Sequence, residues 1–148
     1  MPNIQQQIVD KAREYVGTPF HHQGRLKGVG VDCVGLIICV SKELGLGLEK
    51  YDNTNYSRSP SSTALFDVIA KTNLVELPSL DIQLGDILVF FLNPRTRAPQ
   101  HIAFFSDIGM IHTYEKAKKV SEHSFTKKWR ERLLTVFRLP QAMGGTEE

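Results

Sequence analysis

The N-terminal third of the chain carries its apolar residues at helical spacing. In residues 3–16, apolar side chains recur every three or four positions with polar residues between them, and Gly17 and Pro19 then act as stop signals. The apolar positions are Ile4, Ile8, Ala12, Tyr15 and Val16. A second, more apolar helix is expected to begin after Asp32, a good N-cap residue, and to end near Leu44 at a glycine-rich turn. The pattern therefore predicts two helices joined by a turn-rich loop.

Short apolar runs bounded by turn residues dominate the second half of the chain, and they favour a meander of strands. The predicted strands are 86–92, 101–105, 110–115 and 133–139. Short helices are expected at 63–71 and within 124–132, the latter with Trp129 packed inward, and the polar segment 47–62 is typical of a surface excursion. This order of elements predicts the α+β class, with N-terminal helices packed on a central antiparallel β-sheet.

Length and composition favour a single domain spanning 1–148, with a core at about 4–139 and a frayed C-terminal tail at 141–148. Hydrophobic residues make up 41% of the chain and charged residues 23%, which excludes disordered and fibrous classes. A formal net charge of +2 gives no evidence for a nucleic-acid partner. The N-terminus lacks the cationic region of a signal peptide, and no apolar run approaches the roughly 18 residues of a membrane helix. We therefore expect no membrane insertion and a cytoplasmic location as synthesised.

The chain has two cysteines, Cys33 and Cys39, which fall on the second predicted helix. Six residues of helix separate them by about 9 Å along the axis, which exceeds the reach of a disulfide. Both thiols are therefore expected to be free. Cys39 is flanked by apolar residues in the middle of the helix and is expected in the core, whereas Cys33 lies in the first turn.

The predicted hairpin at 101–115 brings two histidines onto one face of the sheet. If the connecting loop has an even number of residues, the residue numbers of two directly paired residues add up to an odd number. Two registers of the hairpin then remain open. A loop at 105–108 places His101 opposite His112, and a loop at 106–109 places His112 opposite Ala103, which shares a face with His101. Both registers make the two imidazoles neighbours. His123 shows no such partner in the sequence and is expected on the surface.

A thiol at a helix N-terminus together with a histidine pair is typical of thiol hydrolases. The helix dipole and a neighbouring imidazolium are expected to lower the pKa of Cys33, while one imidazole acts as base and the other orients it. Zinc could use the same three side chains, Cys33, His101 and His112, but the paired cysteine or histidine spacing of zinc sites is missing. We therefore expect no metal and no cofactor.

Four segments of the chain resemble the NlpC-like family of cell-wall cysteine peptidases, and especially its phage tail-associated branch. They are "YVGTPFHHQGRLKGVGVDCVGL" at 15–36, "LGDILVFF" at 84–91, and "HIAFF" and "IHTYE" within 101–115. The resemblance implies a papain-like fold, with Cys33 as nucleophile, His101 as general base and His112 as the orienting third member. It also implies cleavage of the amide between γ-D-glutamate and a diamino acid in peptidoglycan stem peptides.

The loop before Cys33 matches the family less closely than the catalytic positions do. Phe20 stands where many relatives have a tyrosine, Val34 stands where a serine is usual, and the phage branch shares His22 and Gln23. The same resemblance leads us to expect Phe20, His22, Gln23 and Asp32 on the substrate-binding side.

Two other functions remain open at this point. One is a phage tail-tip assembly protein, with phage tail proteins as partners and a vestigial triad. The other is a thiol acyltransferase or amidase acting on a substrate outside the wall. In papain-like lipid acyltransferases the histidine precedes the cysteine, whereas here His101 follows Cys33, which favours the peptidase. Because no signal peptide is expected, two routes stay open: delivery to the cell wall inside a phage tail or prophage-derived particle, or action from inside the cell on recycled wall fragments.

Overall fold

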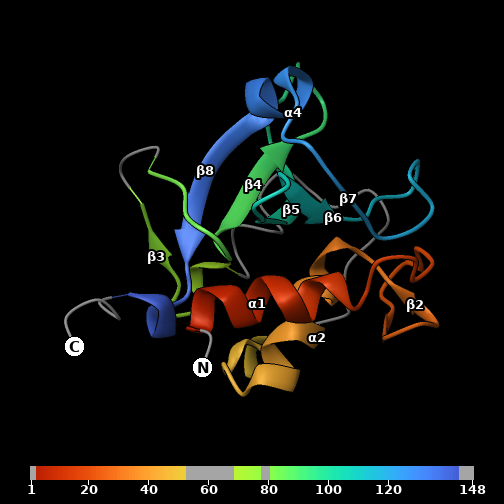
Figure 1. Ribbon diagram of the computed structural model, residues 1–148. Helices are drawn as coiled ribbons and strands as arrows, with labels where there is room; N and C mark the ends of the chain where they lie inside the picture. The colour runs from red at the N-terminus through yellow and green to blue at the C-terminus, as the bar shows by residue number, and fades with distance from the viewer. Residues whose placement is uncertain (1–2, 53–68, 78–80, 144–148) are drawn as a thin grey trace.

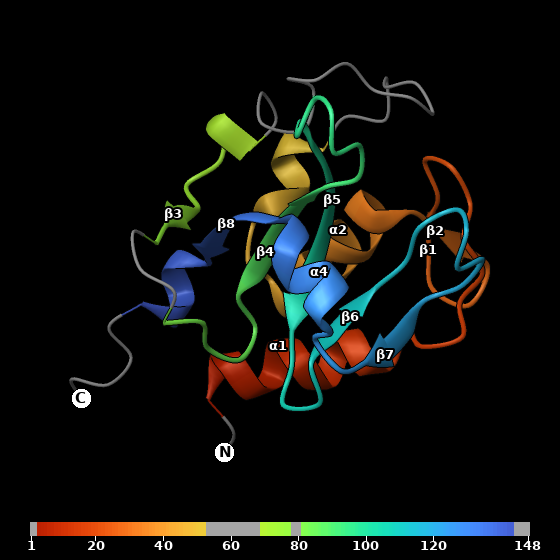
Figure 2. The same ribbon diagram turned by 90° about the horizontal axis from the view of Figure 1, so that it is seen from above.

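The computed structural model describes residues 3–52, 69–77 and 81–143, and it confirms the α+β class. Two N-terminal helices, α1 (Ile4–Arg13) and α2 (Cys33–Leu44), pack together on one side of a six-stranded antiparallel sheet (Figure 1). A short helix, α4 (Lys127–Arg132), lies on the other side (Figure 2).

Helix α1 forms where the apolar stripe predicts it. The side chain of Asn3 accepts a hydrogen bond from the backbone N–H of Gln6 at 2.9 Å and thereby caps the first turn. Ile8 and Ala12 are fully buried, but the prediction that Val16 continues the stripe is wrong, because Val16 is 47% exposed. The helix ends at Arg13, so helical spacing no longer determines which way Val16 faces.

Helix α2 has the predicted ends. Asp32 is its N-cap, and Gly45 follows its last turn with φ +68°, a left-handed conformation that glycine adopts without strain. Before it, residues predicted as loop contain a small hairpin in which β1 (Arg25–Leu26) pairs with β2 (Gly30–Val31). Strands of two residues leave no periodic signal in the sequence.

All four predicted strands are present, and two short edge strands complete the sheet. In spatial order the strands are β3 (Val75–Glu76), β8 (Leu133–Arg138), β4 (Ile87–Phe91), β5 (Pro99–Phe105), β6 (Met110–His112) and β7 (Ser121–His123). The predicted meander holds from β4 to β6, the unpredicted strand β7 pairs with β6, and β8 returns to pair with β4 on its other side. Strand β5 lies inside the sheet, between β4 and β6.

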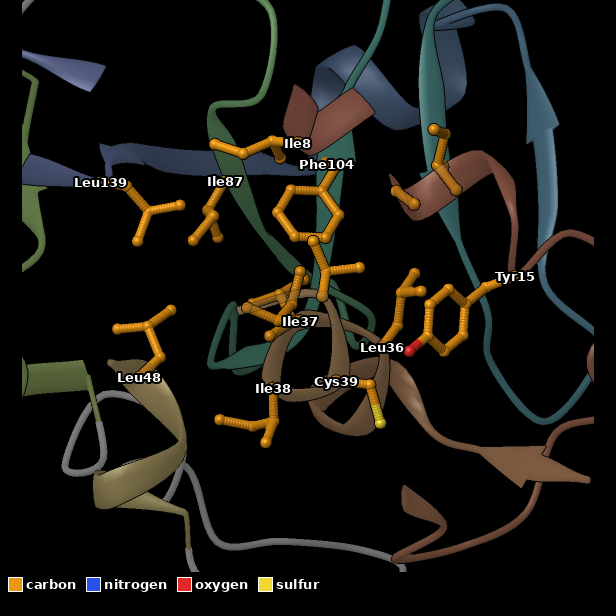
Figure 3. Close-up of a cluster of buried hydrophobic side chains, with 14 of the residues drawn as sticks. Ile8, Tyr15, Leu36, Ile37, Ile38, Cys39, Leu48, Ile87, Phe104 and Leu139 are labelled. Carbon is orange, nitrogen blue, oxygen red and sulfur yellow. The ribbon is translucent and has the colours of Figure 1, made fainter. Parts of the chain in front are cut away.

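The two faces of the sheet have separate apolar cores. The core on the helix side joins α1, α2 and alternate residues of β4 and β5; Figure 3 labels several of its members: Ile8, Tyr15, Leu36, Ile37, Ile38, Cys39, Leu48, Ile87, Phe104 and Leu139. The core on the opposite face comprises Leu88, Phe90, Ala103, Met110, Trp129 and Val136. Trp129 is 4% exposed, as predicted for the inward residue of the short helix, and Cys39 is a core residue, also as predicted.

The remaining predicted segments lie partly outside the described residues. Most of the expected helix at 63–71 and most of the surface excursion at 47–62 fall there, although the start of the excursion forms a 3₁₀ helix, η1 (Leu48–Tyr51). Within the expected tail, Gln141 of the 3₁₀ helix η2 (Pro140–Ala142) donates a hydrogen bond to the carbonyl of Leu46 at 3.0 Å. Across the described ranges, every helix is too short or too polar to cross a membrane.

Candidate active site

Cys33 is the first residue of α2, directly after the N-cap. It is half-buried and packs against the core on the helix side, and neither it nor Cys39 forms a disulfide. Backbone N–H groups of Ile102 and Val34 are close enough to the sulfur to favour its thiolate form. Because Ile102 follows His101 in β5, the helix N-terminus brings the thiol to the strand that carries the predicted base.

Asp32 organises the loop in front of the thiol. One carboxylate oxygen accepts hydrogen bonds from the N–H of Gly35 at 2.8 Å and from Arg25 at 3.1 Å, and the other accepts from the N–H of Gln23 at 2.8 Å. That last bond holds Gln23 at φ +64°, which is uncommon for a residue other than glycine. Asp32 is only 4% exposed, so the structure supports a structural role for it, and its predicted contact with substrate stays a prediction.

The expected lowering of the pKa of Cys33 is wrong for this structure. Burial of the sulfur, followed by the negative charge of Asp32, raises the pKa of the Cys33 thiol to about 12, against the opposite effect of the N–H groups of Ile102 and Val34. The sequence predicts a helix N-terminus and a neighbouring imidazolium, both of which would lower the pKa of the thiol, but the burial of the sulfur comes from tertiary packing. The resting thiol is therefore neutral, and its use as a nucleophile requires a base.

The histidine hairpin adopts the second of the two predicted registers. Phe104 pairs with Ile111 and Phe105 with Met110, with the loop at 106–109, so that His112 faces Ala103 and lies diagonally from His101. The Nε2 atom of His101 is 2.7 Å from the Nδ1 atom of His112, and each residue is 1% exposed. The prediction that these two imidazoles are neighbours is confirmed.

His123 belongs to the same cluster, and its expected surface position is wrong. It is half-buried on β7, and its Nε2 atom is 2.7 Å from the Nε2 atom of His112. The Nδ1 atom of His123 in turn lies 2.8 Å from the carbonyl oxygen of Ser124. The sequence does contain a signal for this position, the equal spacing of the three histidines. His123 follows His112 by the same 11 positions that separate His112 from His101.

Aromatic side chains enclose the histidines. The Trp129 ring centroid lies 5.3 Å from that of His101 and 5.1 Å from that of His112, and the Tyr114 centroid lies 5.5 Å from each. Burial and the neighbouring His112 hold the pKa of His101 well below its ordinary value; burial and then His123 lower the pKa of His112 to about 3. Both imidazoles are therefore neutral at pH 7, and His101 can accept a proton.

The other predicted substrate-binding residues lie on the loop tied to Asp32. Phe20 is half-buried, bridges to Val31 of β2, and donates its N–H to the carbonyl of Lys118 at 2.8 Å. His22 and Gln23 are half-buried next to it. Their role in binding substrate stays a prediction.

Within 3–52, 69–77 and 81–143, no group of three or more histidine, cysteine, aspartate or glutamate side chains is arranged to hold a metal ion.

Solved structures of similar fold include several NlpC/P60 proteins. An NlpC/P60 family protein from Bacillus cereus ATCC 10987 matches with a TM-score of 0.66 and 20% identity, over 91% of this chain and 40% of that protein. The NlpC/p60 domain of the peptidoglycan hydrolase SagA matches with a TM-score of 0.62 and 20% identity, over 90% of this chain and 97% of that domain. NlpC2 from Trichomonas vaginalis matches with a TM-score of 0.68 and 15% identity, over 94% of this chain and 47% of that protein.

Sequence comparison identifies the family directly. A search of curated proteins returns no match, but residues 17–138 match the NlpC/P60 family. That range includes the helix N-terminus with Cys33 and the strands that carry all three clustered histidines. The chain therefore belongs to the NlpC/P60 family, whose members are typically cysteine peptidases and peptidoglycan hydrolases.

Proposed function

We propose that this chain is a cysteine peptidase that cleaves peptidoglycan stem peptides at the amide between γ-D-glutamate and a diamino acid. Membership of the NlpC/P60 family supports the substrate class. The observation that carries the proposal is the buried hydrogen bond between His101 and His112. His101 lies on β5, and the next residue of that strand, Ile102, contacts the thiol of Cys33 through its backbone N–H. This arrangement offers a nucleophile, a base and an orienting group.

The first chemical step is proton transfer from Cys33 to His101. Because Nε2 of His101 is engaged with His112, Nδ1 is the nitrogen left to take the proton. Both partners are neutral at rest, since burial raises the pKa of the thiol and lowers the pKa of the imidazole. The thiolate is therefore generated as the sulfur attacks the carbonyl carbon.

The attack produces a tetrahedral oxyanion and then an acyl-enzyme. Among the first N–H groups of α2, that of Gly35 already donates to Asp32, so we assign the backbone N–H of Cys33 itself to the oxyanion. His101 returns its proton to the leaving amine, and a thioester joins Cys33 to the γ-carbonyl of glutamate. Water, deprotonated by His101, then hydrolyses the thioester and regenerates the thiol.

Mass spectrometry of digested stem peptides tests this proposal. The wild-type chain should release peptides that end at γ-D-glutamate, and Cys33→Ala should release none. Cys39→Ala is the matched control, because it makes the same change in the same helix at a core position, and it should retain cleavage. Release of the same peptides by Cys33→Ala would contradict the proposal, as would no cleavage by the wild-type chain.

We further propose that the protein is made in the cytoplasm and reaches the wall inside a phage tail particle, with tail proteins as partners. Support for this route is limited to the sequence, through the resemblance of the loop that carries His22 and Gln23 to the phage tail-associated branch. Immunodetection of the chain in purified tail particles tests it, and its presence only in particle-free cell fractions would contradict it.

A further inference from the structure

Three imidazoles and one backbone carbonyl form a continuous line across strands β5, β6 and β7. His101 contacts His112 through Nε2 and Nδ1, and His112 contacts His123 through the two Nε2 atoms, at 2.7 Å in both cases. The line ends where Nδ1 of His123 meets the carbonyl oxygen of Ser124 at 2.8 Å. The family-level chemistry above uses only the first two rings.

The carbonyl at the end of the line determines the position of every proton in it. A carbonyl oxygen only accepts, so Nδ1 of His123 must carry a hydrogen, and when this is the only hydrogen on the ring nitrogens, Nε2 is an acceptor. His112 must donate to it from Nε2, which leaves Nδ1 of His112 to accept from Nε2–H of His101. The remaining nitrogen, Nδ1 of His101, consequently keeps its lone pair.

We propose that His123 is a positioning residue, the third imidazole of a histidine relay that fixes His101 in the tautomer whose Nδ1 can accept the proton of Cys33. This inference rests on the proposed function for its catalytic meaning, although the tautomer itself can be measured without any substrate. His123 acts through His112 and is not expected to touch the substrate.

Burial links the three tautomers. His101 and His112 are 1% exposed, and their lowered pKa values mean that each ring carries one proton. If His112 donated from Nδ1 instead, His101 would have to accept at Nε2 and would carry its hydrogen on Nδ1, where it could no longer act as base. His112 alone permits both arrangements, and the acceptor supplied by His123 selects between them.

The surrounding structure holds β7 in position for this contact. Glu122 accepts two hydrogen bonds from Arg13 of α1, both at 2.8 Å, which ties the edge strand to the first helix. Gly109 lets the β5–β6 turn approach β7, since a Cβ atom there would lie 2.3 Å from the carbonyl oxygen of His123. The line of rings is therefore part of a fixed framework.

Three variants of His123 separate hydrogen-bond polarity from packing. His123→Glu offers only acceptors to His112, His123→Lys offers only donors, and His123→Phe fills the space with no hydrogen bond. The full chain is labelled with ¹⁵N, folding is checked by thermal denaturation, and the imidazole nitrogen shifts of His101 report its tautomer. Steady-state kinetics on a stem peptide then give kcat and KM separately.

The relay predicts an order of kcat values and of His101 tautomers among the variants that a packing role does not predict. In the wild-type chain and His123→Glu, His101 should carry its hydrogen on Nε2, with kcat within a few-fold of each other. His123→Lys should move that hydrogen to Nδ1 and lower kcat by about 100-fold at similar KM, the size of a lost acid–base function. His123→Phe should give mixed tautomers and an intermediate kcat.

Equal tautomers and equal kcat values in the Lys and Phe variants would overturn the relay, because a packing role is indifferent to hydrogen-bond polarity. A wild-type His101 with its hydrogen on Nδ1 would overturn it as well. If instead the tautomers follow the predicted order and no variant, including the wild type, cleaves stem peptides, then the proposed function fails while the relay stands.

Discussion

The two faces of β5 differ in chemistry although they are built from alternating residues of one strand. Ile102 and Phe104 face the helices and belong to an apolar core, whereas His101 faces the opposite side and joins a line of imidazoles under Trp129. Both faces contribute packing, because each has its own apolar core, but only the face of His101 carries the imidazoles. Substituting an imidazole should therefore reduce catalysis, and substituting a core residue such as Phe104 should reduce stability.

The largest effect is expected when one substitution on each face of β5 is compared with the other. His101→Gln should lower kcat/KM by about 1,000-fold or more, because it removes the base, while the folded state persists. Phe104→Leu should cost about 1 to 2 kcal/mol of unfolding free energy and leave kcat nearly unchanged. Urea denaturation and steady-state kinetics measure both. Similar kinetic losses in the two variants would contradict this difference between the two faces.

The histidine face should make stability depend on pH in a definite direction. The pKa values of His101 and His112 are lowered in the folded state. Their contribution to the free energy of unfolding is therefore fully present above pH 6.5, the ordinary pKa of histidine. It is lost as the pH falls towards the pKa values of the folded state, which is about 3 for His112. Each group contributes a slope of at most about 1.4 kcal/mol per pH unit.

Urea denaturation between pH 7 and pH 5 checks this dependence, above the range where carboxylates titrate. The unfolding free energy should fall as pH falls, and His112→Asn should show a shallower slope because one titrating group is gone. A wild-type stability that stays level or rises over this interval would contradict the neutral, buried histidine pair.

The helix N-terminus should show a thiol that reacts slowly. Since burial raises the pKa of Cys33 to about 12, iodoacetamide should alkylate it at pH 8 at least about 10-fold more slowly than an unfolded thiol. The rate should keep rising above pH 9. Measurement in the Cys39→Ala background reports Cys33 alone, and a rate that levels off below pH 7 would instead indicate a preformed thiolate.

Asp32→Asn should lower the stability of the protein and raise the reactivity of Cys33 at the same time. Asparagine keeps the N-cap, but the ion pair with Arg25 is lost, so the unfolding free energy should fall by about 1 to 3 kcal/mol. Because the charge of Asp32 raises the pKa of Cys33, alkylation should become faster at the same time. Slower alkylation in a folded variant would contradict this role of the charge.

The elements with strong periodicity could be predicted from the sequence, and the edges of the sheet could not. Helix α2 has a capping residue, an apolar run and a terminal glycine, and β4 is apolar throughout, so both are evident locally. Strand β7 reads Ser-Glu-His and is held by its pairing with β6 and by Arg13, neither of which leaves a local signal. His123 was assigned to the surface for that reason.

At the site, spacing predicted geometry but not electrostatics. A connecting loop with an even number of residues predicts His101 and His112 on one face, as the structure shows, because side-chain direction alternates strictly along a strand. The raised pKa of Cys33 depends on how α2 packs against β5, which the residues around Cys33 do not encode by themselves. The helix dipole and a neighbouring imidazolium therefore predict the wrong direction for the pKa of Cys33.

Acid-quench mass spectrometry during turnover of a stem peptide tests most directly whether the sulfur of Cys33 attacks the γ-glutamyl carbonyl. We predict a thioester adduct that ends at γ-D-glutamate, located by peptide mapping on the peptide that contains Cys33 and absent from the one that contains Cys39. Cleavage that proceeds without any adduct on Cys33, and that continues in Cys33→Ala, would contradict the account.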